Sequence, residues 1–349
     1  MTCKVRGLGM INALGRGALP SVTAAMAGIS QYTETELLNP EGIPLRFALV
    51  PDEILPVIDV ARLSRPGVRY ERMMRLAVGA LDECVGSTEV EHPLPLFLAL
   101  PERRPGRDYP ALEPFLKELS GFTGDVLDLS NSRIFPYGRS AGFTAMASAM
   151  ALLENRNDAG GSTRGGAIKR VLVGGVDSYV DASLLGIMDK QNRLLLENTA
   201  DGFVPGEGAA FLMLEMSSKG RILIHTPVTA SEPGHCYSDE ICEGVGLSGA
   251  IGQAIQQAGS PGIGTVFCSL NGEGVFAKEW GLSAIRVSTL FKDGLQIEHP
   301  AEYYGDIGAA TVPSLYINAL IGRAKDRVDG AVLIWAASDF EHRGAGILV

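Results

Sequence analysis

The stretch GEGAAFLMLE, residues 206–215, combines two glycines with a run of apolar residues. A short continuous apolar run predicts a buried strand, and the glycines predict a close approach of backbone at its start. Two features precede it: a helix pattern rich in small residues at 142–155, and the apolar run VLVGGVDS at 171–178. The order of parts is therefore a small-residue helix, a strand, and a strand opened by glycine.

The same order recurs near the C-terminus. A small-residue helix pattern covers residues 305–322, the apolar run DGAVLIWAASDF covers 329–340, and RGAGILV follows at 343–349. Repetition of a whole set of elements is typical of a fold built from similar units. We therefore predict an N-terminal half at 1–217 and a C-terminal half at 218–349.

Between these landmarks, short β-rich runs alternate with helical patterns. Strand candidates include RILIHTPVTA at 221–230 and TVFCSLNG at 265–272, and helix candidates include 70–85, 247–258 and 307–321. This alternation predicts an α/β protein in which helices cover largely parallel sheets.

Composition and charge exclude several classes of protein. The chain has 349 residues and a net charge of −10, which disfavours nucleic acid and anionic membrane surfaces as partners. No segment approaches the ~20 apolar residues of a membrane-spanning helix, and the N-terminus lacks a signal-peptide pattern, so we expect a cytoplasmic protein. Its five cysteines are scattered, which is typical of free thiols, and we expect neither a metal site nor a cofactor.

Several stretches, in order, resemble the thiolase-fold condensing enzymes, and specifically the β-ketoacyl-acyl-carrier-protein synthases. Among them are TAMAS (144–148), GGVDSYVDASLLG (174–186), DGFVPGEGAAFLMLE (201–215), LNGEGVFAKEW (270–280) and YGDIGAAT (304–311). The resemblance covers essentially the whole chain and implies a thiolase-like fold, with two βαβαβαββ halves in a five-layered αβαβα arrangement. It also implies a role in fatty acid or polyketide biosynthesis.

The family's catalytic residues are a cysteine and a pair of hydrogen-bond donors. This pair is either two histidines or a histidine and an asparagine. The cysteine position within TAMAS is Met146, whose thioether has no proton to lose and cannot carry an acyl group. The first histidine position is Asn271, which can either donate from its amide to a carbonyl or cap a turn ahead of Gly272. The second is Asp306, whose carboxylate would oppose an enolate and is better explained as a helix N-cap.

Other family positions concern the acyl pocket and the C-terminal loop. Phe203, Gly206 and Gly208 border the acyl pocket in the family, although a glycine-rich turn also allows close packing without a ligand. The family's run of glycines is replaced here by SDFEHRGAG at 338–346. Within that loop, His342 is either a recruited base or a surface histidine.

These departures predict a ketosynthase-like protein that is catalytically inactive and acts as a scaffold, partner subunit or chaperone-like accessory protein. Two alternatives stay open: an acyltransferase or malonyl decarboxylase with altered chemistry, and a module that binds an acyl chain or an acyl carrier protein. The resemblance implies a dimer, of two copies or with a related synthase, through the edge near 133–140. An acyl carrier protein and a secretion-associated protein are further candidate partners.

Overall fold

The strand predicted at 206–215 is β8 (Glu207–Met216), which lies inside the sheet of the first half. The structure, a computed structural model, describes residues 1–65, 67–86, 90, 92–105, 112–158, 168–197 and 199–349. β8 runs antiparallel to both of its neighbours, β1 (Thr2–Asn12) and β7 (Arg170–Ser178). Beyond β7, the sheet continues with β5 (Leu96–Ala99) and ends with β6 (Arg133–Phe135), both parallel to β7.

The second half repeats this strand order. β14 (His342–Leu348) runs antiparallel to both β13 (Ala331–Ala337) and β10 (Val228–Ser231), as β8 does to its neighbours. Beyond β13 lie β11 (Ile263–Cys268) and the edge strand β12 (Phe291–Glu298), and these three strands are parallel. The equal strand orders support a division into two similar halves, and the boundary between residues 217 and 218 stays a prediction.

A short strand joins the two sheets. β9 (Ile224–His225) pairs with β1 on one side and, through Ile224 and Leu348, with β14 on the other, so the strands form one continuous sheet. The sequence predicted a single strand at 221–230, and the structure instead divides this segment into β9 and β10. Pro227 lies between them and has no N–H for a ladder hydrogen bond.

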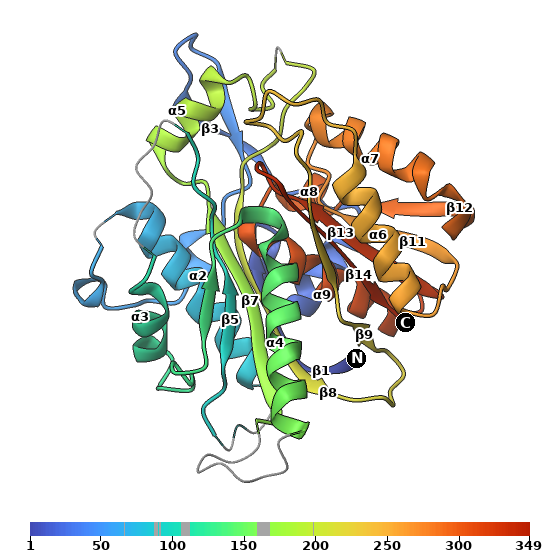
Figure 1. The fold of residues 1–349 in the computed structure, drawn as a ribbon. Helices are drawn as coiled ribbons and strands as arrows, with labels where there is room; N and C mark the ends of the chain where they lie inside the picture. Colours follow the sequence, from blue (N-terminus) through green and yellow to red (C-terminus); the bar gives the residue numbers. More distant parts are fainter. Residues whose placement is uncertain (66, 87–89, 91, 106–111, 159–167, 198) are drawn as a thin grey trace.

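The middle layer of the molecule contains helices from both halves. α4 (Ala141–Asp158) and α9 (Thr311–Ala324) lie between the two sheets, together with α1 (Ala18–Met26) (Figure 1). In β7, Val173 faces this core, whereas its neighbour Leu172 faces the opposite side of the sheet. Because helices cover both faces of the strand, its apolar residues form a continuous run rather than an alternating one.

Two further helix pairs form the outer layers. α2 (Val68–Gly86) and α3 (Phe115–Phe122) pack on the outer face of the first sheet. α6 (Val245–Gln257) and α7 (Gly274–Arg286) pack on the outer face of the second. The layers therefore follow the order α, β, α, β, α, and the predicted thiolase-like arrangement is confirmed.

The remaining elements are short. Apart from short 3-10 helices, they are β2 (Gly15–Arg16), the hairpin of β3 (Thr33–Leu38) and β4 (Pro44–Phe47), and the helices α5 (Ala182–Lys190) and α8 (Ala301–Tyr304). The sequence did not indicate β12, because FKDGLQIE is largely polar and much of this edge strand faces solvent. Within the described parts of the chain, no helix has both the length and the apolar character needed to span a membrane.

Two glycines allow helices and turns to approach the first sheet closely. A Cβ on Gly9 of β1 would lie 1.9 Å from the carbonyl oxygen of Ala80 in α2. A Cβ on Gly175 of β7 would lie 2.2 Å from the carbonyl oxygen of Ala309, just before α9. Neither distance leaves room for a side chain, so glycine at these positions sets the spacing between layers.

Candidate functional site

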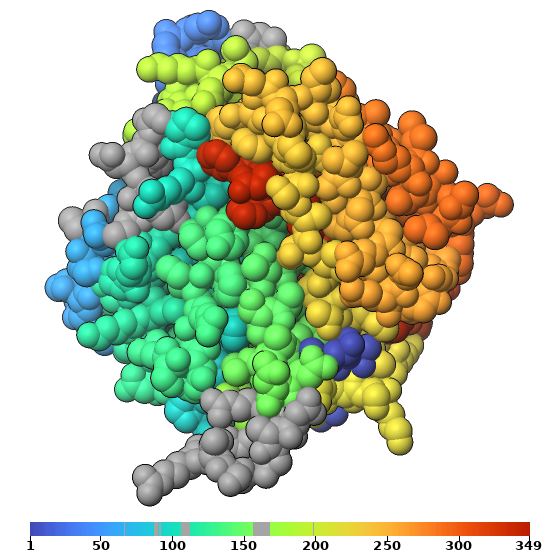
Figure 2. Space-filling view, viewed as in Figure 1, coloured from blue at the N-terminus to red at the C-terminus, as the bar shows by residue number. Residues whose placement is uncertain are grey.

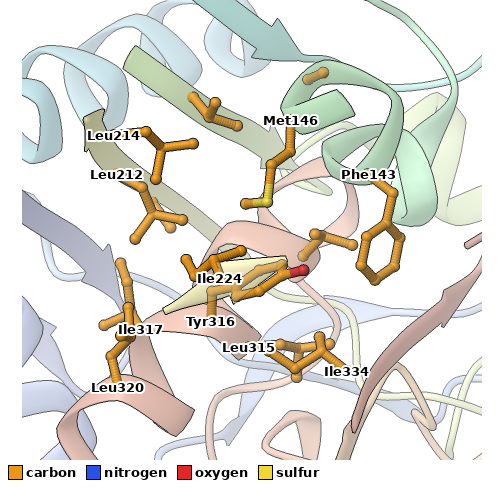
Figure 3. Close-up of a cluster of buried hydrophobic side chains, with 14 of the residues drawn as sticks. Phe143, Met146, Leu212, Leu214, Ile224, Leu315, Tyr316, Ile317, Leu320 and Ile334 are labelled. Carbon is orange, nitrogen blue, oxygen red and sulfur yellow. The ribbon is translucent and has the colours of Figure 1, made fainter. Parts of the chain in front are cut away.

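The structure brings together two of the three predicted catalytic positions. Asn271 follows β11, Asp306 precedes α9, and Asn271 Nδ2 donates a hydrogen bond to Asp306 Oδ2 at 2.8 Å. Met146 has a different environment, since it lies in the second turn of α4 and is fully buried in the apolar middle layer. Figure 3 shows its thioether among side chains that include Leu212 of β8 and Tyr316 of α9.

Both ends of the Asn271 amide are engaged. Its Nδ2 also donates to Glu273 Oε2 at 3.0 Å, and its Oδ1 accepts from the Glu273 N–H at 3.1 Å. The side chain therefore closes the turn around Gly272 that leads into α7, which is one of the two roles predicted for it. Because its Nδ2 faces the carboxylates of Glu273 and Asp306, a substrate carbonyl would have to displace one of these bonds.

Asp306 is 2% exposed, and both of its carboxylate oxygens accept hydrogen bonds. Its Oδ1 accepts from the N–H of Gly308 at 2.7 Å, and its Oδ2 accepts from Arg139 Nη1 at 2.7 Å as well as from Asn271. The first bond satisfies a backbone donor of the short turn Gly308–Ala310 that precedes α9. The N-cap of α9 itself is Ala310, without a side-chain capping bond, so the prediction that Asp306 is the N-cap of this helix is wrong. The second bond pairs the charge of Asp306 with a guanidinium, so Asp306 is an ion-pair partner.

Arg139, which the sequence did not single out, connects several parts of this site. It lies just before α4 and is 1% exposed. Its guanidinium donates to Asp306, to Asp339 and to the carbonyl oxygen of Ala337, and its central carbon lies 4.5 Å from the ring centre of Phe276. A positive charge is therefore fixed between two carboxylates at the N-terminal end of the helix that carries Met146.

The carboxylate of Asp339 pairs with three guanidinium groups. It is fully buried at the end of β13 and accepts from Arg139, from both terminal nitrogens of Arg193 at 2.8 and 2.9 Å, and from Arg104 Nε at 3.0 Å. Burial alone would raise its pKa, but the charges of Arg139, Arg104 and Arg193 together hold the pKa well below its usual range. Asp339 is therefore ionised throughout the neutral pH range.

Arg193 links Asp339 to Glu273, which in turn contacts Asn271. Its Nε and Nη2 donate to the two carboxylate oxygens of Glu273 at 2.6 and 2.9 Å, and Glu273 is the residue that Asn271 contacts. We call this connected group of charged residues the arginine network. It consists of Arg104, Arg139, Arg193, Glu102, Glu273, Asp306 and Asp339.

Glu102 is the member of the arginine network whose pKa lies near neutral pH. Its Oε1 accepts from the backbone N–H of Asp339 at 3.0 Å, whereas its buried Oε2 has no partner among the described residues. Burial raises its pKa to about 7 and the charge of Asp339 adds to the rise, although Arg104 and Arg139 act in the opposite direction. With Glu102 protonated, three arginines balance three carboxylates.

Little space remains beside these groups. A cavity of about 10 Å³ borders Asn271 and Asp306, with Arg139 and Cys268 also in its wall. That volume holds about one water molecule. This cavity is therefore too small for a thioester substrate.

The site also lacks an activated nucleophile among its described residues. Ser140 lies directly before α4, but its Oγ contacts the hydroxyl of Ser338 at 2.8 Å and donates to the carbonyl oxygen of His342, and neither group is a base. Burial raises the pKa of the Cys268 thiol to about 12, so this cysteine is not a thiolate at neutral pH. Neither Ser140 nor Cys268 is therefore activated as a nucleophile.

The C-terminal loop reaches the surface between segments of the two halves, where its red atoms are visible in Figure 2. His342 is partly exposed there, and its ring lies 4.4 Å from that of Tyr137. Burial lowers its pKa, although the charge of Glu341 acts in the opposite direction. The neighbouring Arg343 is buried and pairs with Glu279 at 2.7 Å, so this loop is held by side chains where the family has glycines.

The three residues predicted to border an acyl pocket lie close to the arginine network. Phe203 is fully buried, with its ring 5.7 Å from the guanidinium carbon of Arg193, and the N–H of Gly206 donates to the carbonyl oxygen of Asp306 at 2.9 Å. Neither these two nor Gly208 lines the cavity beside Asp306. Their role in a pocket stays a prediction.

One group of possible metal ligands lies apart from this site. The ligand atoms of Glu232, Cys242 and Glu279 lie within 4.8 Å of one another. However, Glu279 pairs with Arg343, and Glu232 Oε2 accepts from the N–H of Gly246 at 2.7 Å. The positive charge of Arg343 disfavours a cation at this position.

Comparison with solved structures shows which proteins have a fold similar to that of this chain. The chain is similar to the ishigamide ketosynthase/chain length factor, with 16% identity and a TM-score of 0.69 over 100% of this chain and 99% of that one. It is also similar to the ketosynthase ApeO in complex with its chain length factor ApeC from Xenorhabdus doucetiae, with 15% identity and a TM-score of 0.76 over 99% and 97%. A third is AntDE:AntF, a type II acyl-carrier protein in complex with its ketosynthase, with 13% identity and a TM-score of 0.75 over 99% and 98%.

At these identities the similarity establishes the fold and not the activity. The chain therefore has the thiolase fold of ketosynthases and chain length factors, as the resemblance predicted. No protein-family model and no curated protein matches the sequence.

Proposed function

We propose that this chain is a catalytically inactive, ketosynthase-like protein that acts as a scaffold or partner subunit of a related, active synthase in fatty acid or polyketide biosynthesis. The observation that carries the proposal is that Asn271 and Asp306 bind each other and are both held by the arginine network. Asn271 also binds Glu273, and Asp306 also binds Arg139. A condensing enzyme needs a thiolate, and donors that face the substrate carbonyl. In this chain the donor at the first position, Asn271, faces two carboxylates, and the second position, Asp306, is itself a carboxylate.

The energetics of buried ion pairs support the same proposal. Asp306, Asp339 and Arg139 are each at most 2% exposed, so separating them would leave charges without partners in the interior. Breaking a buried pair costs about 3–5 kcal/mol. A substrate that must first open these contacts would bind weakly, because this cost is subtracted from its free energy of binding.

An exposed sheet edge offers a place for the partner. Among the strands of the described chain, β6 is the last one beyond β5. The carbonyl oxygen of Phe135 accepts from the N–H of Leu100 and so points inward, which leaves the N–H and carbonyl of its neighbour Ile134 pointing toward the free edge. A second copy of the chain, or a related synthase, could continue the sheet here; two of the similar structures are themselves named as ketosynthases with chain length factors.

Activity measurements test the inactive state. The purified chain should neither release CO2 from a malonyl-acyl-carrier protein nor condense it with an acyl group, and Met146→Cys should not restore either reaction. The reason is that a thiol at position 146 would stand in the apolar middle layer, without the arginine network having opened. An active ketosynthase assayed in parallel serves as the positive control.

Turnover above background in the unmodified chain, abolished by Asn271→Ala, would contradict this proposal. That result would favour the acyltransferase or malonyl decarboxylase alternative. Turnover gained by Met146→Cys alone would show that the position 146 side chain reaches a substrate.

Replacement of one edge residue tests the partner surface. Ile134→Pro removes the outward N–H of β6 and should shift the molecular mass measured by light scattering from that of a dimer to that of a monomer. The matched variant Ile134→Thr keeps the N–H and should remain dimeric. If the unmodified chain is a monomer and captures no related synthase from its host, or if Ile134→Pro remains assembled, this surface is not the interface.

A further inference from the structure

A large cavity lies away from the arginine network, in the first half. It has a volume of about 700 Å³ and lies between the β3–β4 hairpin, the start of α2 and the start of α5. In Figure 1, β3 and α5 lie next to each other at the top of the molecule. The volume falls within the roughly 300–1,000 Å³ typical of small-molecule pockets.

The wall of this cavity is largely apolar. Phe47 of β4 and Leu185 of α5 form buried parts of it, and Leu37, Leu49 and Val68 form parts that are 52%, 44% and 63% exposed. Large apolar side chains on a concave surface favour an apolar occupant, because filling the cavity removes them from water.

One buried cation in the same wall has unused donor capacity. Arg69 is 9% exposed, and its Nη2 pairs with Asp177 Oδ1 at 2.9 Å. Its buried Nε has no acceptor within the described ranges of the chain. A guanidinium offers five N–H donors in a planar fork, and a carboxylate is the acceptor that matches this geometry.

The charges around the cavity select the same type of ligand. Arg65 also lines the cavity and is exposed, so the cavity wall carries a second positive charge, although the chain as a whole has a net charge of −10. The acidic residue of the lining, Asp181, already accepts from the N–H of Leu184 as the N-cap of α5. An apolar cavity with arginines at one side fits an apolar molecule that ends in a carboxylate.

We propose that this cavity binds a small apolar carboxylate of the fatty acid type. Its hydrocarbon chain lies against Leu37, Phe47, Leu49 and Leu185, and its carboxylate binds at Arg69 with help from Arg65. This site is separate from Asn271 and Asp306, so the inference holds whether or not the chain pairs with a synthase.

Calorimetric titration with decanoate, below its micelle concentration, tests the proposal. Decanoate should bind with one equivalent per chain, and decanol should bind about tenfold more weakly or worse, because it lacks the charged acceptor. Leu49→Glu puts a negative charge in the wall and should weaken decanoate binding by about tenfold or more. Val57→Glu is the matched control, since Val57 is 95% exposed and does not line the cavity.

The head-group assignment needs its own variants. Arg65→Gln keeps the fold, since Arg65 is exposed, and should reduce the preference for decanoate over decanol; Arg69→Gln should abolish that preference if the variant folds. Absence of decanoate binding, equal binding of decanoate and decanol, or binding that Leu49→Glu leaves unchanged would each overturn the proposal.

Discussion

Replacing Arg139 by methionine should lower the free energy of unfolding by about 3–5 kcal/mol, as measured by urea denaturation. The substitution removes the guanidinium from Asp306 and Asp339, which are 2% and 0% exposed, and leaves both carboxylates with one cation fewer. Domains of this kind have only about 5–15 kcal/mol of stability in total. The variant should therefore be marginally folded at 37 °C.

The size of this effect depends on burial and not on the ion pair as such. Arg221→Met provides the matched control, because Arg221 and Asp326 form a pair whose side chains are 75% and 80% exposed. Its effect should stay within about 0.5 kcal/mol. Arg139→Lys keeps the charge but not the planar fork, so it should fall between the two. Equal losses for Arg139→Met and Arg221→Met would contradict the role assigned to the arginine network.

Glu102→Gln should make the protein more stable at pH 8 and leave its stability at pH 4.5 nearly unchanged. In the folded chain the pKa of Glu102 is raised from 4.5 to about 7, mainly by burial, so the folded state binds this proton more tightly than the unfolded state does. The stability that the protonated carboxyl contributes is complete below about 4.5 and is lost as the pH rises toward about 7. The shift corresponds to about 3 kcal/mol.

Denaturation curves recorded across this pH range for both proteins provide the test. The difference between the glutamine variant and the unmodified chain should grow from near zero to about 3 kcal/mol between pH 4.5 and pH 8. Glu240→Gln, at an exposed position, is the control and should show a small difference that does not follow this profile. A difference of the same size at both ends of the range would mean that Glu102 does not change its protonation there.

The fold could be predicted from the sequence because its main signals are local. Small-residue helices and apolar strands recur in the same order in both halves, and each is visible within a stretch of about 20 residues. The order of elements predicted two similar halves, and the resemblance implied the five-layered arrangement, which is confirmed by the way α4 and α9 pack between the sheets. Pro227 was the local signal that divides β9 from β10, and the sequence prediction missed it.

The site was less predictable because its contacts are not local. Arg139 and Asp339 are 200 positions apart, and nothing in either stretch indicates that they pair. A partial signal existed, because Glu102 and Arg104 come within five residues of the end of β5, and Asp339 comes two residues after the end of β13. Polar residues that follow the carboxyl ends of parallel strands are candidates for a common site. The predicted positions Asn271 and Asp306 do contact each other, whereas the part that Met146 plays depends on the activity measurements.

The two-residue strand β9 has a consequence for how the chain is assembled. It connects the sheets through Ile224, while α4 of the first half and α9 of the second half share one apolar core. Neither half therefore has a complete core of its own, because α4 of the first half also packs against strands of the second, and α9 of the second half also packs against strands of the first. The shared core can therefore form only when α9 and β14 are present, so neither half is expected to reach its native packing without residues 311–348.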